Sequence, residues 1–337
     1  MNIKNEKLLN CVNEIKQKRI ISVQINLLNA CTSKCAYCKK NEWPRDVLDA
    51  DVVIRTLKWL AEQGCKTIVF SGGDIVLYKD FEKVVNATHE FGMKCSIIST
   101  LITKNKDLIQ FIARNVDRIH TSVDGSNAEE YKKCRGVDGF NIVVENLKTI
   151  NEIRCKLGMN PVRISSVIST LNYKSLYDLC KLAYDTNSHI KFYTIHDDLQ
   201  YKITSDTSTE LHDEIQKCIE YDKENRTNLK DVLSQEFGEN VIPNSIVCTI
   251  PYIHALINAN GDIYPCCKLM DDNGPYGPQL KYAYGNIYND NLLVEFSKRF
   301  GPIYNICNYC QGCTERYNGL IDDVNEIMNI STSDCYL

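Results

Sequence analysis

Short apolar runs alternate with amphipathic segments from Ile20 to about Thr194. The apolar runs predict strands at 20–28, 67–71, 94–99, 117–122, 162–169 and 190–194. Between them, apolar residues at helical spacing predict helices at 49–63, 79–91, 105–114, 140–157 and 173–187. Strands that alternate with helices predict an α/β fold, in which a parallel sheet is covered by helices.

The flanking segments have different patterns. Residues 1–19 alternate charged and apolar groups, which predicts a short N-terminal amphipathic helix rather than a signal peptide. Residues 201–245 are polar, with two predicted helices around 207–223 and 228–237. We therefore divide the chain into an N-terminal helix (1–19), an α/β domain (20–200), a helical bridge (201–245) and a cysteine-rich domain (246–337).

The composition limits the cellular compartment and the classes of partner that we expect. No run of apolar residues is long enough to span a membrane. The net charge is −4 and the basic residues are dispersed along the chain, so we expect no nucleic-acid partner. The chain has 17 cysteines and no secretory signal, which favours a reducing cytoplasm and metal-bound thiolates over disulfides.

Cys31, Cys35 and Cys38 form a CxxxCxxC run directly after the first predicted strand. Three thiolates on one loop can bind three irons of a 4Fe–4S cube and leave the fourth iron open to a small molecule. A zinc site remains an alternative, although zinc prefers paired CxxC motifs. A c-type haem site would need a histidine where Lys39 stands.

Two further motifs follow predicted strands. Ser71-Gly72-Gly73-Asp74 ends the second strand, and Ser122-Val123-Asp124-Gly125 ends the fourth. The second motif continues with Tyr131, Arg135-Gly136, Gly139-Phe140 and Asn146. Together with the cysteine run, these motifs resemble the radical SAM enzymes of the SPASM/twitch subgroup. The resemblance implies a partial (β/α)6 barrel with a C-terminal twitch/SPASM-like iron–sulfur extension.

The resemblance also implies roles for these residues. Ser71 to Asp74 would bind the amino group of S-adenosylmethionine (SAM), with Asp74 in place of the commoner glutamate. Ser122 and Arg135 would hold the SAM carboxylate, which suits the arginine fork, and Tyr37 is also expected at the cofactor. One departure is Thr100-Leu101-Ile102, where relatives often have Thr-Asn-Gly.

The C-terminal cysteines resemble the SPASM/twitch extension, which carries auxiliary 4Fe–4S clusters. The pattern is Cys-x12-Gly-x4-Cys, then Gly-Asn-Ile and Cys-x2-Cys, with a hairpin predicted between the first two cysteines. There are too few cysteines for two closed clusters, so we expect one auxiliary cluster. Its expected ligands are Cys248, Cys266, Cys307 and Cys310, with Cys313 as a substitute for one of the last two; zinc is the alternative metal.

The resemblance implies an enzyme that cleaves SAM to a 5′-deoxyadenosyl radical, which abstracts hydrogen from a small-molecule or peptide substrate. An electron donor such as flavodoxin or ferredoxin would be its partner. Cys267 stands beside a predicted ligand and is a candidate hydrogen donor, which would give epimerisation; net oxidation is the other outcome. A different class remains open, an iron–sulfur or zinc protein without SAM chemistry.

Overall fold

The described residues of the computed structural model form one sheet with the strand order β6-β5-β4-β3-β2-β1-β7-β8-β9. The structure describes residues 20–38, 43–195, 200–203, 205–224, 226–227, 229, 254–271 and 282–298. The predicted α/β strands are all confirmed, each end within two residues. They are parallel: β1 (Ser22–Leu28), β2 (Thr67–Gly72), β3 (Lys94–Ser99), β4 (Arg118–Ser122), β5 (Arg163–Ile168) and β6 (His189–Thr194).

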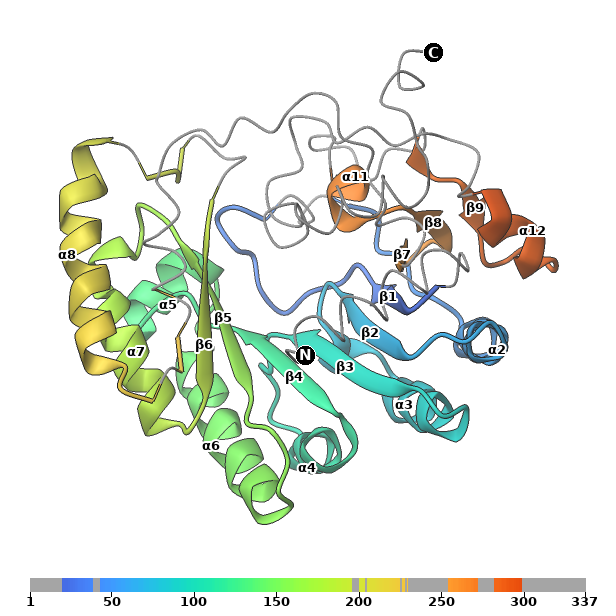
Figure 1. Cartoon of the computed structure of the whole chain (residues 1–337), viewed down its shortest axis with the longest axis horizontal. Coiled ribbons are helices and arrows are strands. Elements are labelled where there is room, and N and C mark those ends of the chain that lie inside the picture. The colour runs from blue at the N-terminus through green and yellow to red at the C-terminus, as the bar shows by residue number, and fades with distance from the viewer. Residues whose placement is uncertain are drawn as a thin grey trace, which may run out of the picture.

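Helices connect these strands and cover the outer side of the arc that they form (Figure 1). Each buries an apolar stripe; in α2, for example, Val53, Leu57 and Leu60 are buried, and the Asp49 side chain caps the first turn. Five predicted helices are confirmed: α2 (Ala50–Glu62), α3 (Phe81–Glu90), α4 (Lys106–Asn115), α6 (Phe140–Lys156) and α7 (Leu176–Asp185).

One helix of the barrel was not predicted. Helix α5 (Ala128–Arg135) has the sequence AEEYKKCR, which has too few apolar residues to show a helical period. The residues at its two ends indicate the helix instead. Asn127 accepts a hydrogen bond from the backbone of Glu130, and Gly136 closes the helix in the left-handed conformation, with φ of 65°.

Helix α8 (Ser205–Tyr221) confirms the first helix predicted for the bridge, and it packs against α7. The second predicted helix (228–237) and the N-terminal helix (1–19) lie outside the described residues. No helix in the described ranges is long and apolar enough to cross a membrane.

The C-terminal hairpin continues the barrel sheet. Strands β7 (His254–Ile257) and β8 (Asp262–Tyr264) are antiparallel, which confirms the hairpin, and β9 (Gly285–Asn286) follows β8. Strand β7 pairs in parallel with β1, a junction that the sequence did not predict. The short helices α11 (Cys267–Asp271) and α12 (Leu292–Ser297) complete this part.

Strand β1 changes register against β2 just before the cysteine loop. Asn26 pairs with Ser71 but Leu28 pairs with Gly72, so one residue of β1 is bulged. A bulge twists a strand locally and redirects the residues that follow it. This irregularity lies directly before the cysteine loop.

Candidate active site

The cysteine loop is bound to the end of helix α5. The backbone N–H of Lys34 donates to the carbonyl of Arg135, and that of Ala36 donates to the carbonyl of Cys134, each at 3.0 Å. The last carbonyls of a helix have no partner within the helix. The loop that carries Cys31, Cys35 and Cys38 satisfies two of them, so loop and helix are held as one unit.

Glycines allow this close approach on both sides of the loop. A Cβ atom at Gly136 would lie 2.2 Å from the carbonyl oxygen of Lys34, and one at Gly73 would lie 2.0 Å from that of Ala30. Neither distance leaves room for a methyl group. Gly73 also donates its N–H to Leu28 at 2.6 Å, and the neighbouring Asp74 N–H donates to Ala30 at 2.9 Å.

The thiols of the loop are partly shielded from solvent. Cys35 is buried, and Cys31 and Cys38 are half-buried. Burial raises the pKa of Cys31 and raises that of Cys35 to about 12, while the nearby Arg135 acts in the opposite direction on both. Because iron is bound by thiolate, cluster binding at this loop must release these protons.

The donor set of the loop bears on the kind of metal centre that it can hold. Among the described residues, no three His, Cys, Asp or Glu side chains converge closely enough to hold one ion. A 4Fe–4S cube places each thiolate on a different iron, so its ligands need not converge on a point. The donor set of this loop, three cysteines and no histidine, fits the cube.

A buried carboxylate at the end of β2 holds the first half of the loop. Asp74 is fully buried. One of its oxygens accepts from Ser99 Oγ at 2.7 Å and from the backbone N–H of Thr100 at 3.3 Å. The other accepts from Thr32 Oγ1 at 2.7 Å and from Thr100 Oγ1. Four donors fill the acceptor capacity of a carboxylate, so Asp74 fixes Thr32 of the loop against the end of β3.

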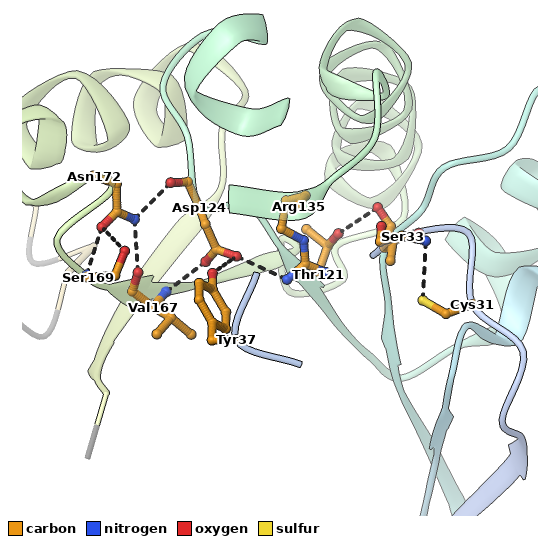
Figure 2. A network of polar contacts seen from close by, with 10 residues as sticks. Cys31, Ser33, Tyr37, Thr121, Asp124, Arg135, Val167, Ser169 and Asn172 are labelled. Carbon is orange, nitrogen blue, oxygen red and sulfur yellow. Dashed lines mark hydrogen bonds and ion pairs between the residues drawn. The ribbon is translucent and has the colours of Figure 1, made fainter. Parts of the chain in front are cut away.

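A second buried carboxylate holds the other half. Figure 2 shows Asp124 between Tyr37, Arg135 and Val167. Its Oδ2 accepts from Tyr37 Oη at 2.5 Å and from Arg135 Nη1 at 3.0 Å, and its Oδ1 accepts from the Val167 N–H at 2.7 Å. Asn172 donates to the Asp124 carbonyl at 2.8 Å. Tyr37, which stands next to Cys38, is thereby tied to β4, β5 and α5.

Arg135 has hydrogen-bonding capacity left over. Its side chain is only 10% exposed, and its Nη1 is occupied by Asp124. Its Nε is buried and has no hydrogen-bond partner among the described atoms. A buried donor without a partner costs about 1–3 kcal/mol. A carboxylate that reached Nε would give this donor a charge-assisted hydrogen bond.

The structure brings together most of the residues predicted to bind the cofactor. Ser71 and Gly72 end β2, Ser122 ends β4, and the Asp74 and Arg135 networks both contact the cysteine loop. At the departure from the family pattern, Leu101 adopts φ of 56°, a conformation that favours Asn or Gly. Asn146 stabilises it by donating to the carbonyl of Leu101 at 2.9 Å.

The C-terminal cysteines are only partly described. Cys266 and Cys267 lie half-buried after β8, and Cys267 begins α11. The nearby Asn286 donates to Asp262 at 2.8 Å and so ties β9 to the hairpin. The predicted ligands Cys248, Cys307 and Cys310, and the possible substitute Cys313, lie outside the described residues.

Comparison with known proteins decides the family. Residues 25–183 match the radical SAM superfamily, and residues 248–314 match SPASM, an iron–sulfur cluster-binding domain. The chain belongs to the radical SAM superfamily. It is a radical SAM enzyme with a SPASM domain, and its cofactors are SAM and 4Fe–4S clusters. The predicted fold class is confirmed.

Known radical SAM proteins share this fold at low sequence identity. Streptococcus suis SuiB bound to its precursor peptide SuiA is 19% identical, with a TM-score of 0.65 over 98% of this chain and 80% of that one. Native anSMEcpe with bound AdoMet is 16% identical, with a TM-score of 0.60 over 91% and 100%. A probable GTP 3′,8-cyclase of Saccharolobus islandicus is 22% identical over 287 residues, covering 80% of this chain and 90% of the relative.

The sequence reading gave no role to several residues of the site. Asp124 was recognised only as part of a motif, although an acidic residue directly after a strand and near Arg135 in the chain was a usable signal. Thr32, Ser99 and Thr100 were missed because hydroxyl residues in loops have no distinctive spacing. Their common feature, hydrogen bonds to Asp74, becomes visible only when β1, β2 and β3 lie side by side.

We predict that Gly136→Ala destabilises the protein more than Gly158→Ala does. Both glycines have φ of 65°, but Gly158 has no neighbouring atom within 4 Å of an added Cβ. Gly158→Ala should cost about 1–2 kcal/mol of unfolding free energy from backbone strain alone. Gly136→Ala should cost a further ~1–3 kcal/mol because it displaces Lys34. Denaturant unfolding measures both, and equal losses would contradict the loop–helix contact.

We also predict energetic coupling between Tyr37 and Asp124. In a double-mutant cycle with Tyr37→Phe and Asp124→Asn, the coupling energy should be about 0.5–3 kcal/mol. Tyr184 is the matched control, since its hydroxyl donates to a different carboxylate, Asp222, at 2.8 Å. Tyr184→Phe and Asp124→Asn should be additive in unfolding free energy. Additivity in both cycles would refute the loop-fixing role of Asp124.

Proposed function

We propose that this enzyme reductively cleaves SAM at a cluster held by Cys31, Cys35 and Cys38, and then removes a hydrogen atom from its substrate. The main support is Arg135. Its Nε is buried and has no hydrogen-bond partner among the described atoms, and its backbone carbonyl accepts a hydrogen bond from Lys34 of the cysteine loop. A structural iron or zinc site would not need such a donor. The carboxylate of a bound amino acid would satisfy it.

When bound to Cys31, Cys35 and Cys38 and to the cofactor site, the cluster and SAM would supply the radical chemistry, the reductive cleavage of SAM. The protein contributes position. Arg135, held by Asp124, would present its free edge to the SAM carboxylate, with Ser122 beside it. The turn from Ser71 to Asp74 would receive the amino group, and Tyr37 would stay oriented by Asp124.

Asp74 has a role in this proposal that does not require direct contact. Its carboxylate already accepts four hydrogen bonds, two of them from Thr100. Direct acceptance from the SAM ammonium would displace one of these donors. Asp74 therefore contributes by fixing Thr32 and Thr100 around the amino-group site, and its direct contact with SAM stays a prediction.

The SPASM domain would hold one auxiliary cluster on Cys248, Cys266, Cys307 and Cys310. This cluster would accept an electron from the substrate radical or anchor the substrate. The substrate would be a peptide or a small molecule; the similarity to SuiB, whose structure contains a precursor peptide, favours the peptide. An electron carrier such as flavodoxin or ferredoxin would reduce the first cluster.

Anaerobic turnover with a chemical reductant tests the function. The reconstituted protein should contain about eight irons and form 5′-deoxyadenosine from SAM. Arg135→Lys keeps a cation beside Asp124 but loses Nε, so it should retain iron and bind SAM about tenfold or more weakly. Equilibrium binding of SAM measures this loss.

Two controls make this result specific. Arg114→Lys, on the exposed side of α4, should leave SAM affinity unchanged. Replacing Cys31, Cys35 and Cys38 with alanine should leave about four irons and abolish 5′-deoxyadenosine. Absence of 5′-deoxyadenosine from the iron-loaded wild-type protein would favour an iron–sulfur protein without SAM chemistry and refute the proposal.

Cys267 distinguishes the two proposed outcomes. If its thiol returns hydrogen to the substrate radical, Cys267→Ala should still form 5′-deoxyadenosine but not the normal product. The wild-type product should then gain one deuterium from deuterated water, and the electron donor would restore the thiol with an electron and a proton. Cys155→Ala, which removes an exposed thiol on α6, should change neither product. A normal product from Cys267→Ala, two hydrogens lighter than the substrate, would establish oxidation instead.

A further inference from the structure

Helix α5 carries a buried hydroxyl to which the site described above gives no role. Tyr131 is fully buried, and its Oη has no hydrogen-bond partner among the described atoms. Buried polar atoms without partners are rare in folded proteins because each one costs free energy. Arg135, one turn farther along α5, has a second such atom, Nε. Residues four apart share one face of a helix, so both atoms belong to the same face of α5.

The cysteine loop is held against the end of this helix on both sides of Cys35. The flanking residues Lys34 and Ala36 donate their backbone N–H groups to carbonyls in the last turn of α5. Cys35 is itself buried. Its thiol lies close enough to Tyr131 for the charge of a Cys35 thiolate to raise the pKa of the Tyr131 hydroxyl. The hydroxyl and the thiol are therefore neighbours in the interior.

The ring and the backbone of Tyr131 are both held in place. The ring packs against Phe140 of α6, with 5.8 Å between the ring centroids. The backbone lies directly under the turn after β4, where a Cβ atom at Gly125 would be 2.2 Å from the Tyr131 nitrogen. That nitrogen donates to the carbonyl of Asn127 at 2.9 Å. The hydroxyl oxygen is thus fixed, and only its hydrogen can turn toward an acceptor.

The charged groups around the hydroxyl leave one acceptor for its hydrogen. The groups that act most strongly on Tyr131 are Arg135, Asp124 and Cys35. A guanidinium can only donate, so Arg135 cannot receive the hydrogen. The oxygens of Asp124 accept from three other donors and not from Tyr131. The sulfur of Cys35 is left.

Cluster binding would turn this sulfur into a strong acceptor. A cysteine binds iron as the thiolate, so it gives up its own hydrogen and carries negative charge. The hydroxyl of a tyrosine keeps its hydrogen near neutral pH and can donate it to such an anion. A cluster on this loop would therefore give Tyr131 the partner that it lacks.

We propose that the Tyr131 hydroxyl donates a hydrogen bond to the sulfur by which Cys35 binds the first 4Fe–4S cluster, and that this bond raises the reduction potential of the cluster. The inference rests on the proposed function, which assigns this cluster to Cys31, Cys35 and Cys38. Hydrogen bonds to the sulfurs help to set the potential of such a cluster. A donor favours the reduced form because that form carries one more negative charge. Tyr131 thus makes the cluster easier to reduce.

Potentiometric titration of the iron-loaded protein, followed by electron paramagnetic resonance of the reduced cluster, tests the proposal. Tyr131→Phe removes only the hydroxyl, and the equilibrium constant for reduction should fall about three- to tenfold, the worth of one hydrogen bond. A tenfold fall is about 59 mV for a one-electron couple. Tyr184→Phe is the matched control, because it removes a hydroxyl that donates to Asp222, and it should leave the constant unchanged.

A second variant separates the donor from the aromatic ring. Tyr131→4-aminophenylalanine keeps a hydrogen-bond donor in place of the hydroxyl, so the equilibrium constant should return toward that of the wild-type protein. If Tyr131→Phe binds no cluster but this variant does, the donor is needed for cluster binding and the inference holds. If neither variant binds a cluster, Tyr131 serves the fold and the inference is wrong.

Three further results would overturn the inference. The first is an unchanged potential in Tyr131→Phe. The second is a lower potential that Tyr131→4-aminophenylalanine does not restore, because it would indicate repacking of the ring. The third is weaker SAM binding by Tyr131→Phe at an unchanged potential, because the hydroxyl would then contact the SAM carboxylate instead.

The same preparations separate this inference from the proposed function. The signal of the first cluster is the one that disappears when Cys31, Cys35 and Cys38 are replaced with alanine. If the iron-loaded wild-type protein lacks this signal, the proposed function fails and the inference fails with it. If the signal is present and 5′-deoxyadenosine forms, but Tyr131→Phe keeps the wild-type potential, the inference alone fails.

Discussion

Burying the guanidinium of Arg135 is costly unless a carboxylate neutralises it. Asp124, fully buried and 3.0 Å away, does so, and the rest of the site depends on this pair. Asp124 fixes Tyr37 and Val167 near the end of β5. The Arg135 carbonyl fixes Lys34 of the cysteine loop. Loss of Asp124 would therefore remove the counter-charge of the Arg135 guanidinium. It would also affect the position of the cysteine loop and the orientation of Arg135 Nε.

The cysteine loop is held at both ends in the same manner. Thr32, next to Cys31, donates to Asp74 after β2, and Tyr37, next to Cys38, donates to Asp124 after β4. Both carboxylates are fully buried, so each bond lies in a medium where it is stronger than in water. Three thiols on a flexible loop would lose much conformational entropy on binding a cluster. Fixing the loop beforehand reduces that loss.

The sequence predicted the elements with a strong hydrophobic period and missed what depends on contacts between distant segments. Strands β1 to β6 are visible as apolar runs, whereas α5 is too polar and is marked only by Asn127 and Gly136. The pairing of β7 with β1 joins residues more than 200 positions apart, and nothing local specifies it. The basic residues likewise look dispersed along the chain. Strand register, which alternation alone does not fix, brings Arg118, Arg163 and Lys191 together.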